Sequence, residues 1–186
     1  MVILYEVHDN LYVNMTNKCP CACTFCLRQT RDEMNHSGSL WLEREPSVEE
    51  VKNEFSKFDM NKYKEVVFCG FGEPTERLDD VLEVCRFIKD KYIRINTNGL
   101  ADLIHKKNTA PMFDGLIDIV SISLNTPNKE RYLELTRSKF GIESFDAMIK
   151  FAENVKHYVK EVVLSTVSTT LTEEEENVPI FVKKSA

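Results

Sequence analysis

The chain has 186 residues, of which 42% are hydrophobic and 29% are charged, and its formal net charge is −6. This length allows one domain with a sizeable core, and the composition is typical of a soluble globular protein. The acidic balance argues against broad, non-specific binding to nucleic acid, and no stretch is long and apolar enough to predict a membrane-spanning helix.

The amino-terminal residues do not have the pattern of a signal peptide, because Glu6, His8 and Asp9 interrupt them and no basic segment precedes them. Six cysteines without an export signal predict a reducing, cytoplasmic environment. Four of the six lie within residues 19–26, and this clustering favours a metal site over disulfides.

Residues 2–7 and 11–16 are two β-rich runs, separated by a turn signal at residues 8–10. They predict a hairpin or two successive strands. The second run leads directly into the cysteines at residues 19–26, so this loop is expected at the carboxyl end of a strand. Folds of the α/β class place their binding sites at such ends.

Residues 19–26 form a cysteine-rich loop in which Cys19, Cys23 and Cys26 have the spacing Cys-x-x-x-Cys-x-x-Cys. Thiolates this close in sequence can hold an iron–sulfur cluster. A cubane cluster usually takes four thiolates, so three would leave one iron open to a substrate or cofactor. Two alternatives stay open. One is a structural zinc site that also uses Cys21, which a single short loop would strain, and the other is a disulfide framework.

The motif Cys19-x-x-x-Cys23-x-Phe25-Cys26 resembles the signature of the radical S-adenosylmethionine (SAM) enzymes. The resemblance implies that Cys19, Cys23 and Cys26 hold a [4Fe–4S] cluster, whose fourth iron chelates the amino and carboxylate groups of SAM. One electron from the reduced cluster then cleaves SAM to methionine and a 5′-deoxyadenosyl radical, which abstracts hydrogen from a substrate. Phe25 is expected to pack on the adenine or beside the cluster.

Residues 27–45 are polar and show little periodicity. They form either a lid or substrate loop, or an ordinary surface excursion with Trp41 packed on the core. A helix is expected after them, because Ser47 and Glu50 have capping-box spacing and residues 48–58 carry an apolar stripe.

Residues 65–69 predict a short buried strand that ends in Gly70-Phe71-Gly72-Glu73-Pro74. Glycines at a strand end let a ligand approach the backbone closely, and a carboxylate can accept hydrogen bonds from an ammonium group. The segment resembles the Gly-Gly-Glu-Pro motif of the radical SAM family, with Phe71 in place of the first glycine. This resemblance implies that Gly72 and Glu73 hold the methionine end of SAM.

The next predicted elements are a helix over residues 78–88, a strand over 92–97 and a strand over 118–125. Cys69 and Cys85 are interpreted as core residues and not as cluster ligands. Thr97-Asn98-Gly99 resembles a strand-end triplet beside SAM in activating-enzyme-like members, although Asn-Gly is also a general turn signal. By the same analogy Asn98, Ser123 and Asn125 contact the ribose or carboxylate of SAM. The alternative for Ser123 and Asn125 is that turn-forming residues simply end the strand.

Helices are predicted over residues 128–137 and 145–155, and a fifth strand over 161–167, from which Ser165, Thr166 and Ser168 could reach a ligand. The acidic run at residues 173–176 predicts a helix start, and residues 178–182 predict a short sixth strand. The last βα unit is therefore abbreviated.

Strands that alternate with amphipathic helices predict βαβ units and a parallel sheet. A complete barrel puts eight units into ~250 residues, so this chain has room for about six. We therefore predict an α/β fold, namely a partial (β/α)6 TIM-like barrel with parallel strands, as the resemblance to the radical SAM core implies. A single domain is expected over residues 1–186.

Residues 10–17 and 69–75 most resemble small radical SAM proteins linked to TatD-type nucleases, a likeness that supplies no substrate. Two other compact groups are 7-carboxy-7-deazaguanine synthases, whose threonine after the last cysteine is replaced here by Leu27, and glycyl-radical activating enzymes, which act on a large partner protein. The family implies a flavodoxin or ferredoxin-type electron donor. An alternative from another class is a non-catalytic iron–sulfur or zinc protein that senses redox state, and it predicts no SAM binding.

Overall fold

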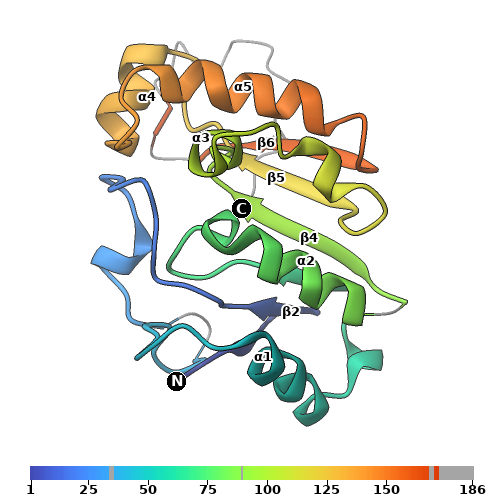
Figure 1. The fold of residues 1–186 in the computed structure, drawn as a ribbon. Coiled ribbons are helices and arrows are strands. Elements are labelled where there is room, and N and C mark those ends of the chain that lie inside the picture. The colour runs from blue at the N-terminus through green and yellow to red at the C-terminus, as the bar shows by residue number, and fades with distance from the viewer. Residues whose placement is uncertain (34–35, 89, 168–169, 172–186) are drawn as a thin grey trace.

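The computed structural model describes residues 1–33, 36–88, 90–167 and 170–171. Its centre is a six-stranded sheet in which strands that are adjacent in sequence are also paired in space (Figure 1). The strands are β1 (Leu4–Val7), β2 (Asn10–Val13), β3 (Glu65–Phe68), β4 (Tyr92–Thr97), β5 (Ile119–Ser123) and β6 (Glu161–Ser165). The α-helices are α1 (Val48–Glu54), α2 (Leu78–Phe87), α3 (Ala101–His105), α4 (Lys129–Thr136) and α5 (Glu143–Val155). Short 3₁₀ helices are η1 (Leu27–Gln29), η2 (Phe55–Lys57), η3 (Met60–Lys62), η4 (Pro74–Arg77) and η5 (Ala110–Phe113).

Strands β2 to β6 are parallel, and helical crossovers connect them, which confirms the predicted α/β fold. Strand β1 is the exception, because it pairs antiparallel with β2 from Leu4↔Val13 to Val7↔Asn10. A parallel pair needs a crossover of a dozen or more residues, and the turn at His8 and Asp9 is far shorter. The predicted hairpin is therefore confirmed, and the predicted parallel strands begin at β2.

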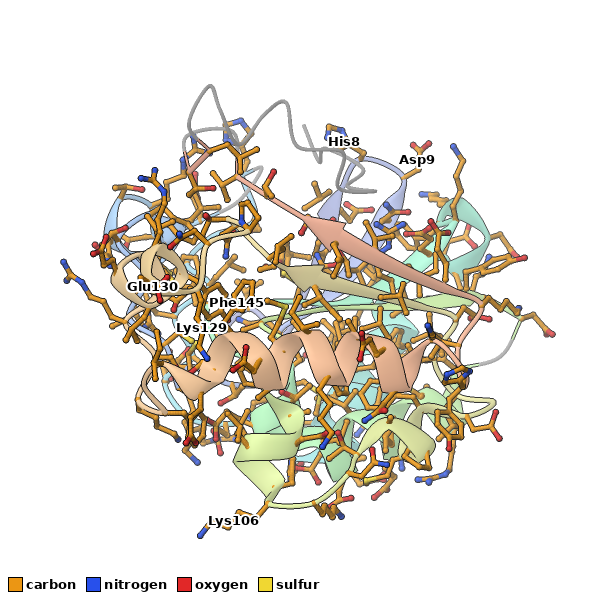
Figure 2. All side chains as sticks on the ribbon, turned by 90° about the horizontal axis from the view of Figure 1, so that it is seen from above. His8, Asp9, Lys106, Lys129, Glu130 and Phe145 are labelled. Carbon is orange, nitrogen blue, oxygen red and sulfur yellow. The ribbon has the colours of Figure 1, made fainter. Side chains whose placement is uncertain are left out.

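The two faces of the sheet differ in polarity. In β4, Ile93 and Ile95 are buried, while Arg94 and Asn96 between them are only half-buried. The apolar face packs against α2, α3 and α5, which lie on the same side of the sheet (Figures 1 and 2). Parallel strands that are covered on both faces usually read as continuous apolar runs. The opposite face thus carries Arg94 and Asn96 of β4, next to Val67 of β3 and Ser121 of β5.

Local signals in the sequence fix the starts of the helices. Ser47 caps α1 through the predicted capping box, because its hydroxyl accepts a hydrogen bond from Glu50 N and its own N–H donates to the Glu50 carboxylate. Asn128 caps α4 by accepting from Arg131 N at 2.8 Å. Figure 2 shows the two ends of the parallel strands: the turn at His8 and Asp9 at one end, and the start of α4 at Lys129 and Glu130 at the other.

Several predicted features of the carboxyl-terminal segment lie outside the described residues. They are Ser168, the acidic run at residues 173–176 and the sixth parallel strand at residues 178–182. Within the described ranges, no helix is both long and apolar enough to cross a membrane.

Candidate functional site

The cysteine-rich loop follows β2 and is anchored to the far end of α4. Ala22 N donates to Thr136 O and Thr24 N donates to Leu135 O, both at 2.9 Å, and Lys139 N donates to Pro20 O at the same distance. Three backbone hydrogen bonds therefore join segments that are more than a hundred residues apart in sequence. The loop is held between the first parallel strand and the helix that follows the fourth.

The side chains that directly follow the loop in sequence donate hydrogen bonds to backbone carbonyls in and before it. The Arg28 guanidinium donates to Cys21 O at 3.3 Å and to Asn17 O at 3.5 Å. Gln29 Nε2 donates to Cys23 O at 2.8 Å. These bonds satisfy carbonyl groups of the loop and leave the cysteine sulfurs free for other contacts.

The Cys21 thiol is buried, and the Asn98 amide nitrogen lies 3.9 Å from its sulfur. Hydrogen bonding to Cys21 is the main reason why the pKa values of Cys19 and Cys23 lie below that of an ordinary thiol. Burial raises the pKa of Cys26.

The structure excludes one of the two alternatives to a cluster. All six cysteines are free thiols, so there is no disulfide framework. Among the described residues, no three His, Cys, Asp or Glu side chains are grouped to hold one metal ion. A structural zinc ion and a cubane cluster both need thiolates that converge on one centre, so metal analysis of the wild-type chain distinguishes iron from zinc.

Glu73 is a buried carboxylate beside this loop, with a relative exposure of 4%. Its Oε1 accepts from Thr75 N, Thr75 Oγ1 and Thr97 Oγ1 at 3.1, 2.7 and 2.6 Å, and its Oε2 accepts only from Asn98 N, at 2.7 Å. A carboxylate offers about four acceptor positions on its two oxygens, so Oε2 has room for another donor. Burial raises the pKa of Glu73. Within the described part of the chain, no lysine or arginine side chain donates to it.

Asn98 connects Glu73 with the cysteine loop. Its backbone N–H donates to Glu73, its Oδ1 accepts from Leu100 N at 2.9 Å, and its Nδ2 lies 3.9 Å from the sulfur of Cys21. The structure thus brings together the predicted cysteine, Glu73 and Asn98 positions. The Asn98 amide, however, is directed at Cys21 and so supports the loop.

Gly72 is required by the close approach of another chain segment. A Cβ atom at this position would lie 2.3 Å from Thr16 O and 2.7 Å from Lys18 O. Glu73 N donates to the same Lys18 O at 2.7 Å. The sequence motif predicts that a ligand approaches the backbone at this glycine. In the structure, the Glu73 turn packs there against the residues that precede Cys19.

Ser123 and Asn125 lie at the carboxyl end of β5, and the contacts described for them connect this end to β6. Asn125 has a left-handed backbone with φ 62°, its Nδ2 donates to Ser123 O at 3.2 Å, and its N–H donates to Ser165 O at the same distance. These contacts are those of turn formers at a strand end. A role for either residue in binding SAM stays a prediction, as does the packing of Phe25, which is half-buried in the cysteine loop.

The polar segment after the cysteines packs on the sheet edge, as the surface-excursion interpretation expects. Leu40 and Leu42 are buried, and Asn14 Nδ2 and Asn17 Nδ2 donate to their carbonyls at 2.8 and 2.7 Å. The Trp41 ring meets the Phe71 ring edge-on, with centroids 5.1 Å apart, although 39% of Trp41 stays exposed. The segment therefore covers the Gly70–Pro74 turn from outside.

Sequence reasoning missed two side chains of the site, Thr75 and Tyr132, and named Thr97 only as part of the triplet that resembles one beside SAM. Thr75 and Thr97 both donate to Glu73 but lie on different elements, so the sequence does not show that they share this partner. Tyr132 is a fully buried residue of α4. Its apolar spacing in a predicted helix is typical of a core residue, so nothing in the sequence distinguishes it.

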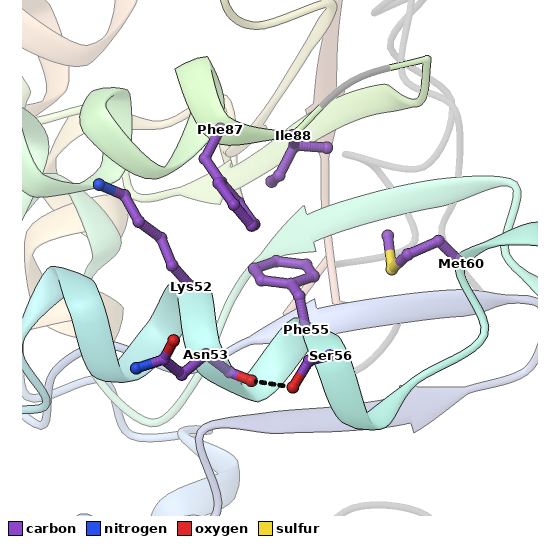
Figure 3. A pocket seen from close by; sticks show the side chains of 7 residues that line it. All are labelled: Lys52, Asn53, Phe55, Ser56, Met60, Phe87 and Ile88. Carbon is purple, nitrogen blue, oxygen red and sulfur yellow. Dashed lines mark hydrogen bonds between the residues drawn. The ribbon is translucent and has the colours of Figure 1, made fainter.

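A pocket of about 410 Å³ lies between α1 and α2 and is separate from the site (Figure 3). Its lining residues are Lys52, Asn53, Phe55, Ser56, Met60, Phe87 and Ile88. Several of them belong to the segments that lead into the amino ends of β3 and β4, whereas the cysteine loop follows the carboxyl end of β2. The pocket is therefore at the opposite end of the parallel strands.

Comparisons with known proteins agree with this arrangement. Residues 13–179 match the family model of the Radical SAM superfamily. The chain is 30% identical over 147 residues to a probable GTP 3',8-cyclase of Methanothermobacter marburgensis, a match that covers 73% of this chain and 43% of that protein. It is 26% identical over 158 residues to a probable dual-specificity RNA methyltransferase RlmN of Exiguobacterium sibiricum, covering 76% of this chain and 40% of the relative.

Among solved structures, the chain resembles Streptococcus suis SuiB bound to precursor peptide SuiA, with a TM-score of 0.65 and 19% identity, over 93% of this chain and 36% of that one. At this identity the likeness shows the fold alone, and it agrees with the predicted partial TIM-like barrel core. The chain spans less than half the length of the two curated relatives. The family match nevertheless includes both the cysteine loop and the Glu73 turn. The chain belongs to the radical SAM superfamily.

Proposed function

We propose that this chain carries the cofactor-binding core of a radical SAM enzyme. In this proposal Cys19, Cys23 and Cys26 hold a [4Fe–4S] cluster, and Glu73 binds the ammonium group of SAM. When bound, the two cofactors supply one-electron cleavage of SAM and abstraction of hydrogen from a substrate. The proposal rests chiefly on one observation: Glu73 is a buried carboxylate with an open acceptor position, joined to the cysteine loop through Asn98.

The residues of the chain position the cofactors and exclude water from them. Arg28 and Gln29 donate to loop carbonyls, and the carbonyls at the end of α4 accept from loop N–H groups, so the backbone that carries the cysteines is held in place. Glu73 keeps its carboxylate in place through four hydrogen bonds from residues of two strand ends. An ammonium group at Oε2 would complete the acceptor positions and neutralise a buried charge, which is strongly favourable in a dry site.

We infer that the substrate meets the polar face of the sheet, where Arg94 and Asn96 are half-buried. The curated relatives are named for different reactions, so we assign the chemistry of the core and no substrate. A flavodoxin or ferredoxin-type protein is proposed as the electron donor, because the chemistry of the family starts with one electron. We place the protein in the cytoplasm on its cysteine usage.

The cluster assignment predicts a definite pattern among the six cysteines. After anaerobic reconstitution with iron and sulfide, the wild-type chain is expected to hold about four iron atoms. Replacement of Cys19, Cys23 or Cys26 by alanine should abolish the cluster, as measured by iron content and by electron paramagnetic resonance of the reduced protein. Cys85→Ala is the matched control, because Cys85 is buried in the core away from the loop.

The variant Cys21→Ala distinguishes this proposal from a zinc site that is bound by all four cysteines of the loop. Cys21→Ala should keep the iron, although it removes the hydrogen bonds to Cys19 and Cys23. Zinc in place of iron, bound by the wild-type chain and lost in Cys21→Ala as well as in the other three variants, would contradict the proposal.

A further inference from the structure

Tyr132 carries an unpartnered hydroxyl group in the interior of the protein. The side chain has a relative exposure of 1%, and its ring packs edge-on against Phe145 with centroids 5.5 Å apart. Its hydroxyl oxygen is buried and has no hydrogen-bond partner among the residues that the structure describes. A buried polar group without a partner destabilises a fold by about 1–3 kcal/mol, and such groups are rare enough to require an explanation.

Tyr132 lies on α4, the helix whose end is hydrogen-bonded to the cysteine loop. Tyr132 lies one helical turn before Leu135 and Thr136, the two residues whose carbonyls anchor the cysteine loop, and Thr136 Oγ1 donates to Tyr132 O at 2.8 Å. Burial is the main cause of the raised pKa of Tyr132, and Cys21, Cys23, Glu73 and Cys19 add to it. The phenol therefore keeps its proton and can act as a donor, and it lies on the helix whose end is hydrogen-bonded to the cysteine loop.

We propose that the Tyr132 hydroxyl donates a hydrogen bond to the carboxylate of bound SAM. The inference rests on the proposed function and extends it to a residue of α4. If the ammonium of SAM occupies Glu73, the carboxylate on the same carbon atom lies close by, where it needs a donor. The hydroxyls of Thr75 and Thr97 already donate to Glu73, whereas the hydroxyl of Tyr132 has no acceptor among the described residues.

The test compares SAM with decarboxylated SAM, which lacks the carboxylate. Dissociation constants of both ligands are measured for the reconstituted wild-type protein and for Tyr132→Phe, a variant that keeps the ring and its contact with Phe145. Tyr92→Phe is the control. Tyr92 is more than half exposed and lies near Lys160, far from the cysteine loop.

Loss of the hydroxyl should weaken SAM binding about 10-fold or more, since a hydrogen bond to a charged group is involved. Binding of decarboxylated SAM should be the same in Tyr132→Phe and in the wild type. The cofactor-free Tyr132→Phe protein should unfold at the same temperature as the wild type or at a higher one, because the substitution removes an unpartnered buried group. A purely structural role of the hydroxyl predicts the opposite shift in this temperature.

Equal loss of affinity for both ligands in Tyr132→Phe would overturn the inference, and so would unchanged affinity for SAM. A changed spectrum of the reduced cluster without SAM would also overturn it, because the hydroxyl would then face the cluster. These outcomes leave the proposed function intact. If the wild-type protein forms no cluster or binds no SAM, the proposed function and this inference fail together.

Discussion

Replacement of Glu73 by glutamine is expected to weaken SAM binding by about 30- to 5000-fold, because removing one partner of a buried, hydrogen-bonded charge pair costs about 2–5 kcal/mol. Glutamine keeps the size of the side chain but cannot neutralise an ammonium group, and it leaves one of the backbone N–H groups of Thr75 and Asn98 without an acceptor. Equilibrium dialysis of SAM against the reconstituted protein measures the effect.

Glu76→Gln is the matched control for this experiment. Glu76 lies in η4, the 3₁₀ helix that Glu73 caps, but its carboxylate pairs with Lys139 at 3.6 Å and makes no hydrogen bond to Thr97 or Asn98. The iron content of both variants should equal that of the wild type, since neither residue is a cluster ligand. Equal SAM affinity in Glu73→Gln and Glu76→Gln would show that Glu73 is only a structural carboxylate.

The same carboxylate gives SAM binding a dependence on pH. Burial raises the pKa of Glu73 above the ordinary value of 4.5, so the cofactor-free protein holds a proton there at a pH where an exposed glutamate has lost it. An ammonium ligand requires the ionised form. Affinity for SAM should therefore increase as pH rises through the raised pKa, and binding should release a proton in that window.

The stability of the cofactor-free protein should change in the opposite direction. Between pH 4.5 and the raised pKa the native state binds more protons at Glu73 than the unfolded state does, so this residue's contribution to the free energy of unfolding falls as pH rises. Calorimetric titrations in buffers of different ionisation enthalpy measure the proton release. An identical release in Glu73→Gln would assign it to another group.

Gly72→Ala is expected to disrupt the site through packing alone. The added Cβ would lie 2.3 Å from Thr16 O, and a backbone carbonyl cannot rotate away as a flexible side chain would. Overpacking of this kind destabilises a fold by about 1–3 kcal/mol, which lowers the unfolding temperature of a chain of this size by about 3–10 °C. Because Thr16 and Lys18 immediately precede Cys19, we also expect loss of the reconstituted cluster.

Gly115→Ala separates this effect from the general consequences of replacing glycine. Gly115 has a φ of 68°, and no atom lies within 4 Å of the position of its added Cβ. It should lose about 1 kcal/mol from backbone strain and keep its iron. If Gly72→Ala retains both the cluster and the wild-type unfolding temperature, the close packing of the Glu73 turn against the cysteine loop is not required.

Features that depend on local sequence could be predicted without the structure. Ser47 and Glu50 form the capping box that their spacing indicates, and β4 covers the predicted residues 92–97. The cysteine loop and Gly70–Pro74 do follow the carboxyl ends of neighbouring parallel strands. In each case residues close together in the sequence determine the structure, through a helix cap, the period of a strand or a turn residue.

Features that depend on contacts between distant segments could not be predicted. The partners of Glu73 are Thr97 and Asn98, more than twenty residues away. Tyr132 has the spacing of a core residue. A role in the site is indicated only by the hydrogen bonds between α4 and the cysteine loop, and by a hydroxyl group that has no partner among the described residues.

The most direct test of the proposed function is the formation of 5′-deoxyadenosine by the reconstituted, reduced protein in the presence of SAM. We expect the wild-type protein to form it, Cys23→Ala to form none, and Glu73→Gln to form far less at a limiting concentration of SAM. Cys85→Ala is the control and should behave like the wild type. If both proteins hold the cluster but leave SAM intact, the assignment of this chain as the core of a radical SAM enzyme is contradicted.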